Sequence, residues 1–176
     1  MYIPIILGTA RIGRQSEKVA GFMLAETRKY GLDSEIIDVR DFRIEATDNT
    51  GQGNQAVRLA EKVSRADGLI IVSPEYNRGY PGELKMMLDM LYKQYARKPV
   101  AICGVSSGPF GGARMMQQLK LICLGLHMVP LDDAIYFSNV EDLFDASGAI
   151  KTPSYYKQAK HLLDELVWHA GVLRKG

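Results

Sequence analysis

The sequence has 176 residues, of which 47% are hydrophobic and 24% are charged, and its formal net charge is +2. This length suits one α/β domain over residues 1–176, with a core large enough to hold a ligand cleft. The small net charge does not indicate a nucleic-acid partner, and no apolar run approaches the ~18 residues of a membrane span, so no membrane partner is expected either.

Five short apolar runs alternate with longer helical patterns along the chain. The first, third and fourth runs are apolar nearly throughout, which is typical of parallel strands covered on both faces. The predicted strands are residues 2–7, 35–39, 69–73, 100–105 and 129–135. The predicted helices are residues 16–30, 54–66, 81–95, 112–126 and 152–173.

Two prolines support the predicted helix starts. Pro81 suits the first turn of the third helix, because the N–H that proline lacks would have no partner there. Thr152 and Pro153 predict the N-cap and the first residue of the last helix. The only long polar segment, residues 140–151, is predicted to be a surface loop before that helix.

Strand and helix alternate five times, which predicts a right-handed parallel α/β sheet. For this length we expect the flavodoxin-like order 2-1-3-4-5, a three-layer sandwich with helices on both faces of the sheet. Ligands of such folds bind outside the carboxyl ends of the strands, around the switch point between strands 1 and 3. The loops after strands 1, 3 and 4 are therefore expected to form the site.

The two cysteines, Cys103 and Cys123, both lie in apolar stretches. They are expected to be buried small hydrophobic residues, and without C-x-x-C spacing they predict neither a zinc site nor a dithiol redox motif. Free cysteines fit a reducing compartment, and the first strand leads directly into a glycine-rich turn rather than resembling a signal peptide. We therefore expect a cytoplasmic protein.

The loop after the first strand, residues 8–16, combines glycines with the start of a helix. Such a turn gathers unpaired backbone N–H groups and the positive end of the helix dipole, which predicts an anion site. The dinucleotide fingerprint would need glycine in place of Ala10, although Asp38 fits its acidic position. The nucleotide P-loop would need Lys at Arg14 and Ser or Thr at Gln15.

The same loop offers two hydroxyls and two guanidinium groups, on Thr9, Ser16, Arg11 and Arg14. This set suits a terminal monophosphate such as that of FMN. The alternative is structural: Ser16 is the helix N-cap and the arginines are solvated. The sequence leaves open which of Arg11 and Arg14 contacts the phosphate.

The loops after strands 3 and 4 suit close contact with a flat ligand. Residues 73–82 hold two prolines that stiffen the chain, with Tyr76 and Asn77 offering stacking and hydrogen bonds. Residues 104–114 hold four glycines, which allow the backbone to approach a ligand closely. Either loop alone could be an ordinary tight turn, but three such loops at neighbouring strand ends favour a binding site.

Three segments resemble the NADPH-dependent FMN reductase family. They are G-T-x-R at residues 8–11, S-P-E-Y-N-R-G-Y-P-G-x-L-K at residues 73–85, and S-S-G-x-x-G-G at residues 106–112. The resemblance covers residues 1 to about 170, and P-E-Y-N is its specific part. It implies bound FMN and electron transfer from NAD(P)H to a small-molecule acceptor, such as a flavin, a quinone, an azo compound or a metal oxyanion. It also implies a homodimer or homotetramer.

The resemblance assigns cofactor-binding roles by position. It implies that Thr9, Arg11 and Ser16 hold the FMN phosphate, with Gln15 in the same loop. Residues implied to line the flavin ring or ribityl chain are Pro74, Glu75, Tyr76, Asn77, Ser106, Ser107, Gly108 and Gly111. Arg14 and Ser16 depart from the family, which often has serine and asparagine at these positions.

Redox chemistry that the cofactor carries needs no side-chain acid or base, so we nominate no catalytic residue and no metal ligand. Three alternatives remain. One is a flavodoxin-type electron carrier without its own NAD(P)H activity, which the near-neutral charge disfavours. The others are a nucleotide phosphotransferase and an NAD-dependent dehydrogenase, which the two incomplete motifs disfavour.

Overall fold

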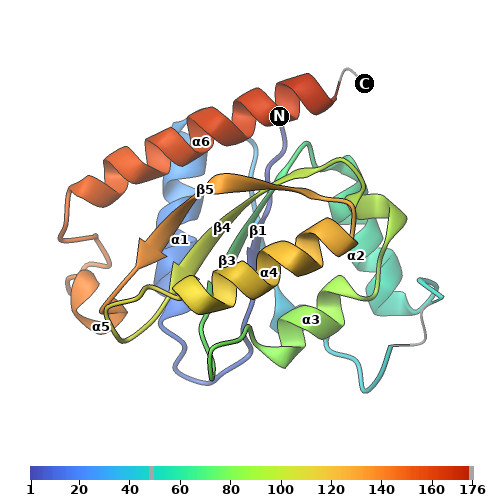
Figure 1. The fold of residues 1–176 in the computed structure, drawn as a ribbon, viewed down its shortest axis with the longest axis horizontal. Helices are drawn as coiled ribbons and strands as arrows, with labels where there is room; N and C mark the ends of the chain where they lie inside the picture. The colour runs from blue at the N-terminus through green and yellow to red at the C-terminus, as the bar shows by residue number, and fades with distance from the viewer. Residues whose placement is uncertain (48–49, 175–176) are drawn as a thin grey trace.

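A computed structural model describes residues 1–47 and 50–174 of the chain. In this part of the chain, five strands form one sheet in the order β2-β1-β3-β4-β5, and every neighbouring pair is parallel. The strands are β1 (Ile5–Leu7), β2 (Ile36–Asp38), β3 (Leu69–Pro74), β4 (Pro99–Val105) and β5 (Val129–Phe137). The predicted flavodoxin-like arrangement is confirmed (Figure 1).

Helices cover both faces of the sheet. The α-helices are α1 (Ser16–Lys29), α2 (Asn54–Arg65), α3 (Gly82–Leu88), α4 (Ala113–Gly125), α5 (Val140–Leu143) and α6 (Ser154–Leu173), and the 3-10 turns are η1 (Val39–Phe42) and η2 (Lys93–Tyr95). Buried side chains of α2, α3 and α4 share one hydrophobic cluster, and those of α1, α5 and α6 share the other. The three layers of the sandwich follow from this division (Figure 1).

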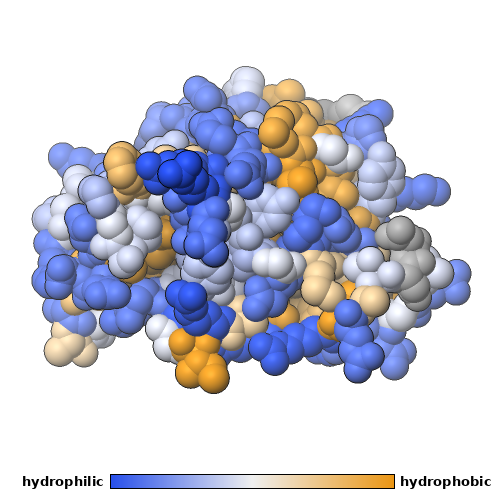
Figure 2. All heavy atoms as spheres, turned by 60° about the horizontal axis from the view of Figure 1, so that its bottom comes forward, coloured by the Kyte–Doolittle hydropathy of each residue, from blue (hydrophilic) through white to orange (hydrophobic). Residues whose placement is uncertain are grey.

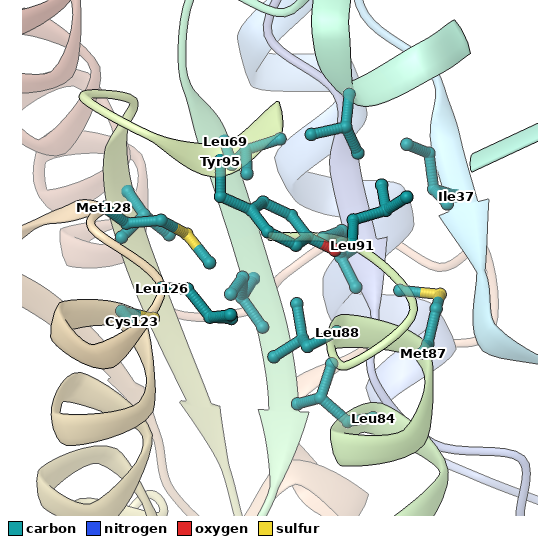
Figure 3. Packing of buried hydrophobic residues seen from close by; sticks show 14 of the residues in the cluster. Ile37, Leu69, Leu84, Met87, Leu88, Leu91, Tyr95, Cys123, Leu126 and Met128 are labelled. Atoms are coloured by element: carbon teal, nitrogen blue, oxygen red, sulfur yellow. The ribbon is translucent and has the colours of Figure 1, made fainter. Parts of the chain in front are cut away.

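Side chains of the central strands alternate between the two hydrophobic clusters. In β3, Ile71 belongs to the cluster of α2, α3 and α4, whereas Ile70 and Val72 belong to the opposite one. Successive side chains of a strand point to opposite faces, so a strand that is apolar throughout fills two cores. Figure 3 shows the first cluster, where Tyr95 and Leu88 lie among residues from several elements.

Both cysteines are fully buried, and they lie on opposite faces of the sheet. Burial raises the pKa of the Cys103 thiol above its usual range and raises that of Cys123 to about 12. The expectation of buried small hydrophobic residues is confirmed.

The third helix is shorter than predicted. It begins at Gly82 and ends at Leu88, and Pro81 is an extended N-cap with φ −60° and ψ 141° rather than a residue of the first turn. After this helix the chain turns so that Tyr95 becomes fully buried. Burial of a large side chain outweighs the helical pattern on which the prediction was based.

The prediction of a surface loop at residues 140–151 is wrong. The segment contains α5, and four of its apolar residues are buried in the cluster beneath α6: Val140, Leu143, Phe144 and Ile150. Its polar residues hide this pattern in the sequence. At the next helix the N-cap is Pro153 rather than the predicted Thr152, so α6 begins at Ser154, one position later than expected. No helix in the described ranges is long and apolar enough to cross a membrane.

Candidate functional site

A cleft of about 200 Å³ opens at the carboxyl ends of β1, β3 and β4. It is lined by Arg11, Gly13, Arg14, Gln15, Ser16, Pro74, Glu75, Tyr76, Val105, Ser106, Ser107, Val140 and Glu141. All three predicted loops therefore contribute to it. Figure 2 turns this lower side of Figure 1 toward the viewer and shows a mostly hydrophilic surface with separate hydrophobic groups.

Eight of the predicted cofactor-binding residues line the cleft: Arg11, Gln15, Ser16, Pro74, Glu75, Tyr76, Ser106 and Ser107. Four others do not: Thr9, Asn77, Gly108 and Gly111. Sequence reasoning missed Gly13, Val105, Val140 and Glu141. The last two come from α5, and no sequence signal marked them, because their segment was interpreted as a surface loop.

The alternative interpretation of this loop expected Ser16 to be the N-cap of α1, and this expectation is wrong. The cap position belongs to Gln15, which makes no side-chain capping bond, and the helix begins at Ser16. Ser16 Oγ and Gln15 Oε1 are buried, and neither has a hydrogen-bond partner in the part of the chain that the structure describes. A buried polar atom left unpaired costs about 1–3 kcal/mol. Two such atoms at a helix N-terminus in a cleft fit a bound polar group.

Arg14 is a buried residue, with its side chain only 2% exposed. Its guanidinium pairs with both carboxylate oxygens of Asp38 and donates to the Thr9 carbonyl oxygen at 2.6 Å. The bonds to Asp38 raise the pKa of Arg14 against the opposing effect of burial. The hydrogen bonds of the Arg14 guanidinium are therefore made to groups within the protein.

Arg11 has different surroundings. It is exposed, and its guanidinium lies 4.3 Å from the centre of the Tyr76 ring. The Tyr76 hydroxyl lies 2.9 Å from Thr9 Oγ1, so the loop after β3 packs across the loop after β1. Thr9 itself is buried behind this contact. Of the two arginines, Arg11 is the one accessible to a ligand.

A tight two-residue turn follows Tyr76. Asn77 and Arg78 both have positive φ, at 51° and 68°, and Tyr76 and Gly79 exchange backbone hydrogen bonds of 2.9 Å on either side. This geometry is that of a hairpin turn in which asparagine is a favoured residue. Asn77 is exposed at the tip of the turn, outside the cleft lining.

Glu75 joins two of the loops. Its Oε2 accepts hydrogen bonds from the backbone N–H groups of Arg114 at 3.1 Å and Met115 at 3.3 Å, in the first turn of α4. The N-cap of that helix is Gly112, which has no side chain, so Glu75 provides the cap from another loop. Its carboxylate serves the cleft by fixing the loop after β3 to α4.

Two of the glycines after β4, Gly104 and Gly111, are required by close packing within the protein itself. A Cβ on Gly104 would lie 2.3 Å from the Gly111 carbonyl oxygen. Gly111 has φ +56°, and a Cβ there would lie 2.6 Å from the Cβ of Tyr136. Gly108 has open space around it, and its carbonyl oxygen accepts from Ser106 Oγ at 2.7 Å.

Comparison with known proteins identifies a family and several similar sequences. The profile of the NADPH-dependent FMN reductase family matches residues 1–142. A 2-hydroxy-1,4-benzoquinone reductase of a Burkholderia species is 28% identical over 170 residues, which cover 93% of this chain and 92% of that protein. An NAD(P)H-dependent FMN reductase of Schizosaccharomyces pombe is 32% identical over 136 residues, or 72% of this chain and 67% of that protein.

The fold is also found among solved structures. FerB, a flavoenzyme NAD(P)H:(acceptor) oxidoreductase from Paracoccus denitrificans, superposes with a TM-score of 0.80 at 22% identity. The match covers 99% of this chain and 97% of that one. The α/β sandwich is therefore shared along nearly the whole chain.

Proposed function

The chain belongs to the NADPH-dependent FMN reductase family, and we propose that the cleft at the ends of β1, β3 and β4 holds its FMN. The unpartnered Ser16 hydroxyl at the N-terminus of α1 is the observation that carries this assignment. When bound there, FMN supplies the redox chemistry, accepting electrons from NAD(P)H and delivering them to an acceptor.

Ser16 and Arg11 are assigned to the phosphate. The Ser16 hydroxyl lies in the first turn of α1, where backbone N–H groups and the helix dipole favour an anion. Arg11 adds an exposed positive charge to the cleft lining, which Arg14 cannot do while it is paired with Asp38. Gln15 Oε1 is an acceptor suited to a ribityl hydroxyl.

The opposite wall of the cleft is assigned to the flavin ring. Pro74, Tyr76, Ser106 and Ser107 supply a stiff backbone, an aromatic face and hydroxyl groups there. Rigid apolar surfaces with a few fixed polar groups are typical of cofactor sites. Glu75 contributes by holding this wall against α4.

We assign quinones as the class of electron acceptor. A relative aligned over nearly its whole length is named a benzoquinone reductase, which supports this choice. A quinone is flat, so it can stack on the exposed face of a bound flavin. Two relatives are named as reductases, one of a benzoquinone and one an NAD(P)H-dependent FMN reductase, and this favours an enzyme over a flavodoxin-type carrier.

We also propose that the protein acts in the cytoplasm as a homodimer or homotetramer. Leu121 and Leu124, three positions apart on α4, are 68% and 55% exposed, and Tyr92, which contacts His127 just after that helix, is 53% exposed. Exposed apolar side chains on and near one helix support an interface between copies of the chain. Light scattering after gel filtration measures the oligomer directly, and a monomer would contradict the proposal.

The absorption spectrum of the purified full-length chain tests the function. We expect a flavin spectrum that bleaches on anaerobic addition of NADPH and returns when a benzoquinone is added. A flavodoxin-type carrier would bind FMN without being bleached by NADPH. A colourless protein that takes up no FMN would overturn the assignment of the cleft.

A further inference from the structure

Three successive carbonyl groups of the loop after β1 are each held by an arginine. Arg14 donates to the Thr9 oxygen at 2.6 Å. Arg40 donates from Nε to the Ala10 oxygen at 3.3 Å and from Nη2 to the Arg11 oxygen at 2.6 Å. The two guanidinium groups thus bind the carbonyl oxygens of three consecutive residues, 9–11.

Asp38 ties the two arginines together. It ends β2, in register with Leu7 at the end of β1, and its carboxylate pairs with the Arg14 guanidinium. Its Oδ1 also accepts the backbone N–H of Arg40 at 2.9 Å. Burial alone would raise the pKa of Asp38, but the bonds from Arg14 and Arg40 outweigh burial and lower it. The carboxylate is therefore ionised and fully engaged.

The planar trans peptide bond fixes the consequence for the N–H groups. A carbonyl and the following N–H point in opposite directions, so the N–H groups of Ala10, Arg11 and Ile12 point away from the arginines. Arg11 N–H already donates to Thr9 Oγ1 at 3.3 Å, and that hydroxyl meets Tyr76 on the cleft wall. The carbonyl oxygens of this stretch are therefore engaged by the two arginines, and its N–H groups point to the other side of the loop.

We propose that Arg14, Asp38 and Arg40 form a carbonyl brace that positions the loop after β1 to bind the FMN phosphate. The proposal rests on the proposed function. The brace acts in two ways: it turns carbonyl dipoles away from an anion, and its arginines balance the negative charge of Asp38 close to the phosphate. The residues of the brace are positioning residues, because they act through the backbone of the loop.

The same pairing bears on cofactor choice. In dinucleotide-binding folds an acidic residue at the end of the second strand accepts hydrogen bonds from a ribose. Asp38 occupies the corresponding place, yet both of its oxygens are paired with Arg14. The Asp38 carboxylate stands where it could bind the ribose of a dinucleotide. In the brace it instead holds the arginines that position the loop for a monophosphate.

FMN and riboflavin differ only in the phosphate, so their relative affinities test the brace. Dissociation constants for both flavins are measured on the purified full-length chain and on Arg14→Met and Arg40→Met, by quenching of flavin fluorescence. We expect FMN affinity to fall about 10- to 100-fold while riboflavin affinity stays within about 2-fold. Arg14→Lys keeps the charge but not the two-pronged contact, and it should restore only part of the FMN affinity.

Two comparisons make the outcome decisive. Arg28→Met is the matched control, because Arg28 also donates to a loop carbonyl, that of Ser34, but lies outside the cleft lining. It should leave both affinities unchanged. If Arg14→Met and Arg40→Met keep the wild-type preference for FMN over riboflavin, or lose affinity for both flavins equally, the proposed brace is overturned. Arg40→Met keeps the test open if Arg14→Met fails to fold, since it leaves Arg14 paired with Asp38.

Failure of the proposed function gives a different result. If the wild-type chain binds FMN no better than riboflavin, the phosphate site itself is wrong, whatever the variants do. If the wild-type chain prefers FMN and only the variants behave unexpectedly, the phosphate site stands and the brace alone is rejected.

Discussion

Two arginines in the same loop have opposite surroundings, and this division sets their roles. The Arg14 side chain is 2% exposed and bonded to Asp38, whereas Arg11 is exposed and rests on the Tyr76 ring. A buried, doubly paired guanidinium is costly to disturb, because its removal leaves an unpaired charge. An exposed guanidinium can turn toward a ligand with little cost.

Arg11→Ala should therefore weaken FMN binding without affecting the fold. A charge-assisted hydrogen bond to phosphate contributes about 1.5–3 kcal/mol, so we expect affinity to fall about 10- to 100-fold. Flavin content after gel filtration measures the loss. The control Arg43→Ala removes an exposed arginine just after η1, outside the cleft lining. Equal flavin content in both variants would remove Arg11 from the site.

The thiols should be inert in the native protein. Cys103 and Cys123 are fully buried, and burial raises the pKa of both, that of Cys123 to about 12, so almost no thiolate forms at pH 8. Since the thiolate is the reactive species, a thiol-specific dye should label neither cysteine until denaturant is added, when both should react. Rapid labelling of the native chain would contradict the buried assignment.

Residue by residue, the sequence predicted what depends on local pattern. It identified the apolar surroundings of the cysteines, which the structure confirms, and it selected Ser16, which lies in the cleft lining. It did not distinguish Arg11 from Arg14, because the partner of Arg14 is Asp38, 24 positions away. Only the pairing of β1 with β2 brings that carboxylate to the loop.

At the scale of elements, helix α4 begins without a capping side chain of its own. Gly112 occupies the N-cap with φ 83°, a conformation that suits glycine, and Glu75 supplies the missing acceptor from the loop after β3. The Glu75 side chain is only 12% exposed. A single carboxylate thus stabilises a helix start and the cleft wall together.

Glu75→Ala should destabilise the fold by about 1 kcal/mol, the usual contribution of a helix cap. Glu75→Gln keeps an acceptor oxygen and should lose less. Urea unfolding followed by circular dichroism measures both, with Glu61→Ala on the exposed side of α2 as the control. Matching midpoints for Glu75→Ala and the control would show that Glu75 does not act as the cap.

Element order was predictable, whereas two element boundaries were not. Strand and helix alternation predicts a parallel sheet with right-handed crossovers, and five strands in a chain of this length favour the order 2-1-3-4-5. The end of α3 and the fold of residues 140–151 depend instead on which side chains the core accepts. Tyr95 and Phe144 are buried by contacts distant in sequence, and no local period reports those contacts.

For the molecule as a whole, binding chemistry and a cluster of stabilising charges lie at opposite ends of the sheet. The cleft is at the carboxyl ends of the strands. At the amino ends, Glu35 accepts bonds from the Tyr2 hydroxyl at 2.5 Å, from Lys62 at 2.5 Å and from Arg65 at 2.9 Å. These contacts join the starts of β1 and β2 to α2.

Acid should weaken the fold through Glu35. Burial alone would raise the pKa of Glu35, but the bonds from Lys62, Tyr2 and Arg65 outweigh burial and hold it below its usual value. The folded-state pKa is thus lower than the unfolded one of about 4.3. The resulting stability is present above that pH and is lost as the pH falls through the folded-state pKa.

Alkali should act through the same cluster with the opposite sign. Burial and the bond to Glu35 raise the pKa of Tyr2 to about 12, so its contribution is complete below about pH 10 and is lost as the pH rises toward 12. Urea midpoints measured across pH should decline less steeply in acid for Glu35→Gln, and less steeply in alkali for Tyr2→Phe. If the urea midpoints of these variants decline as steeply as those of the wild-type chain in acid and in alkali, the cluster does not control the pH range of the fold. Because the cluster lies away from the cleft, Tyr2→Phe should change this profile while FMN affinity near neutral pH stays constant.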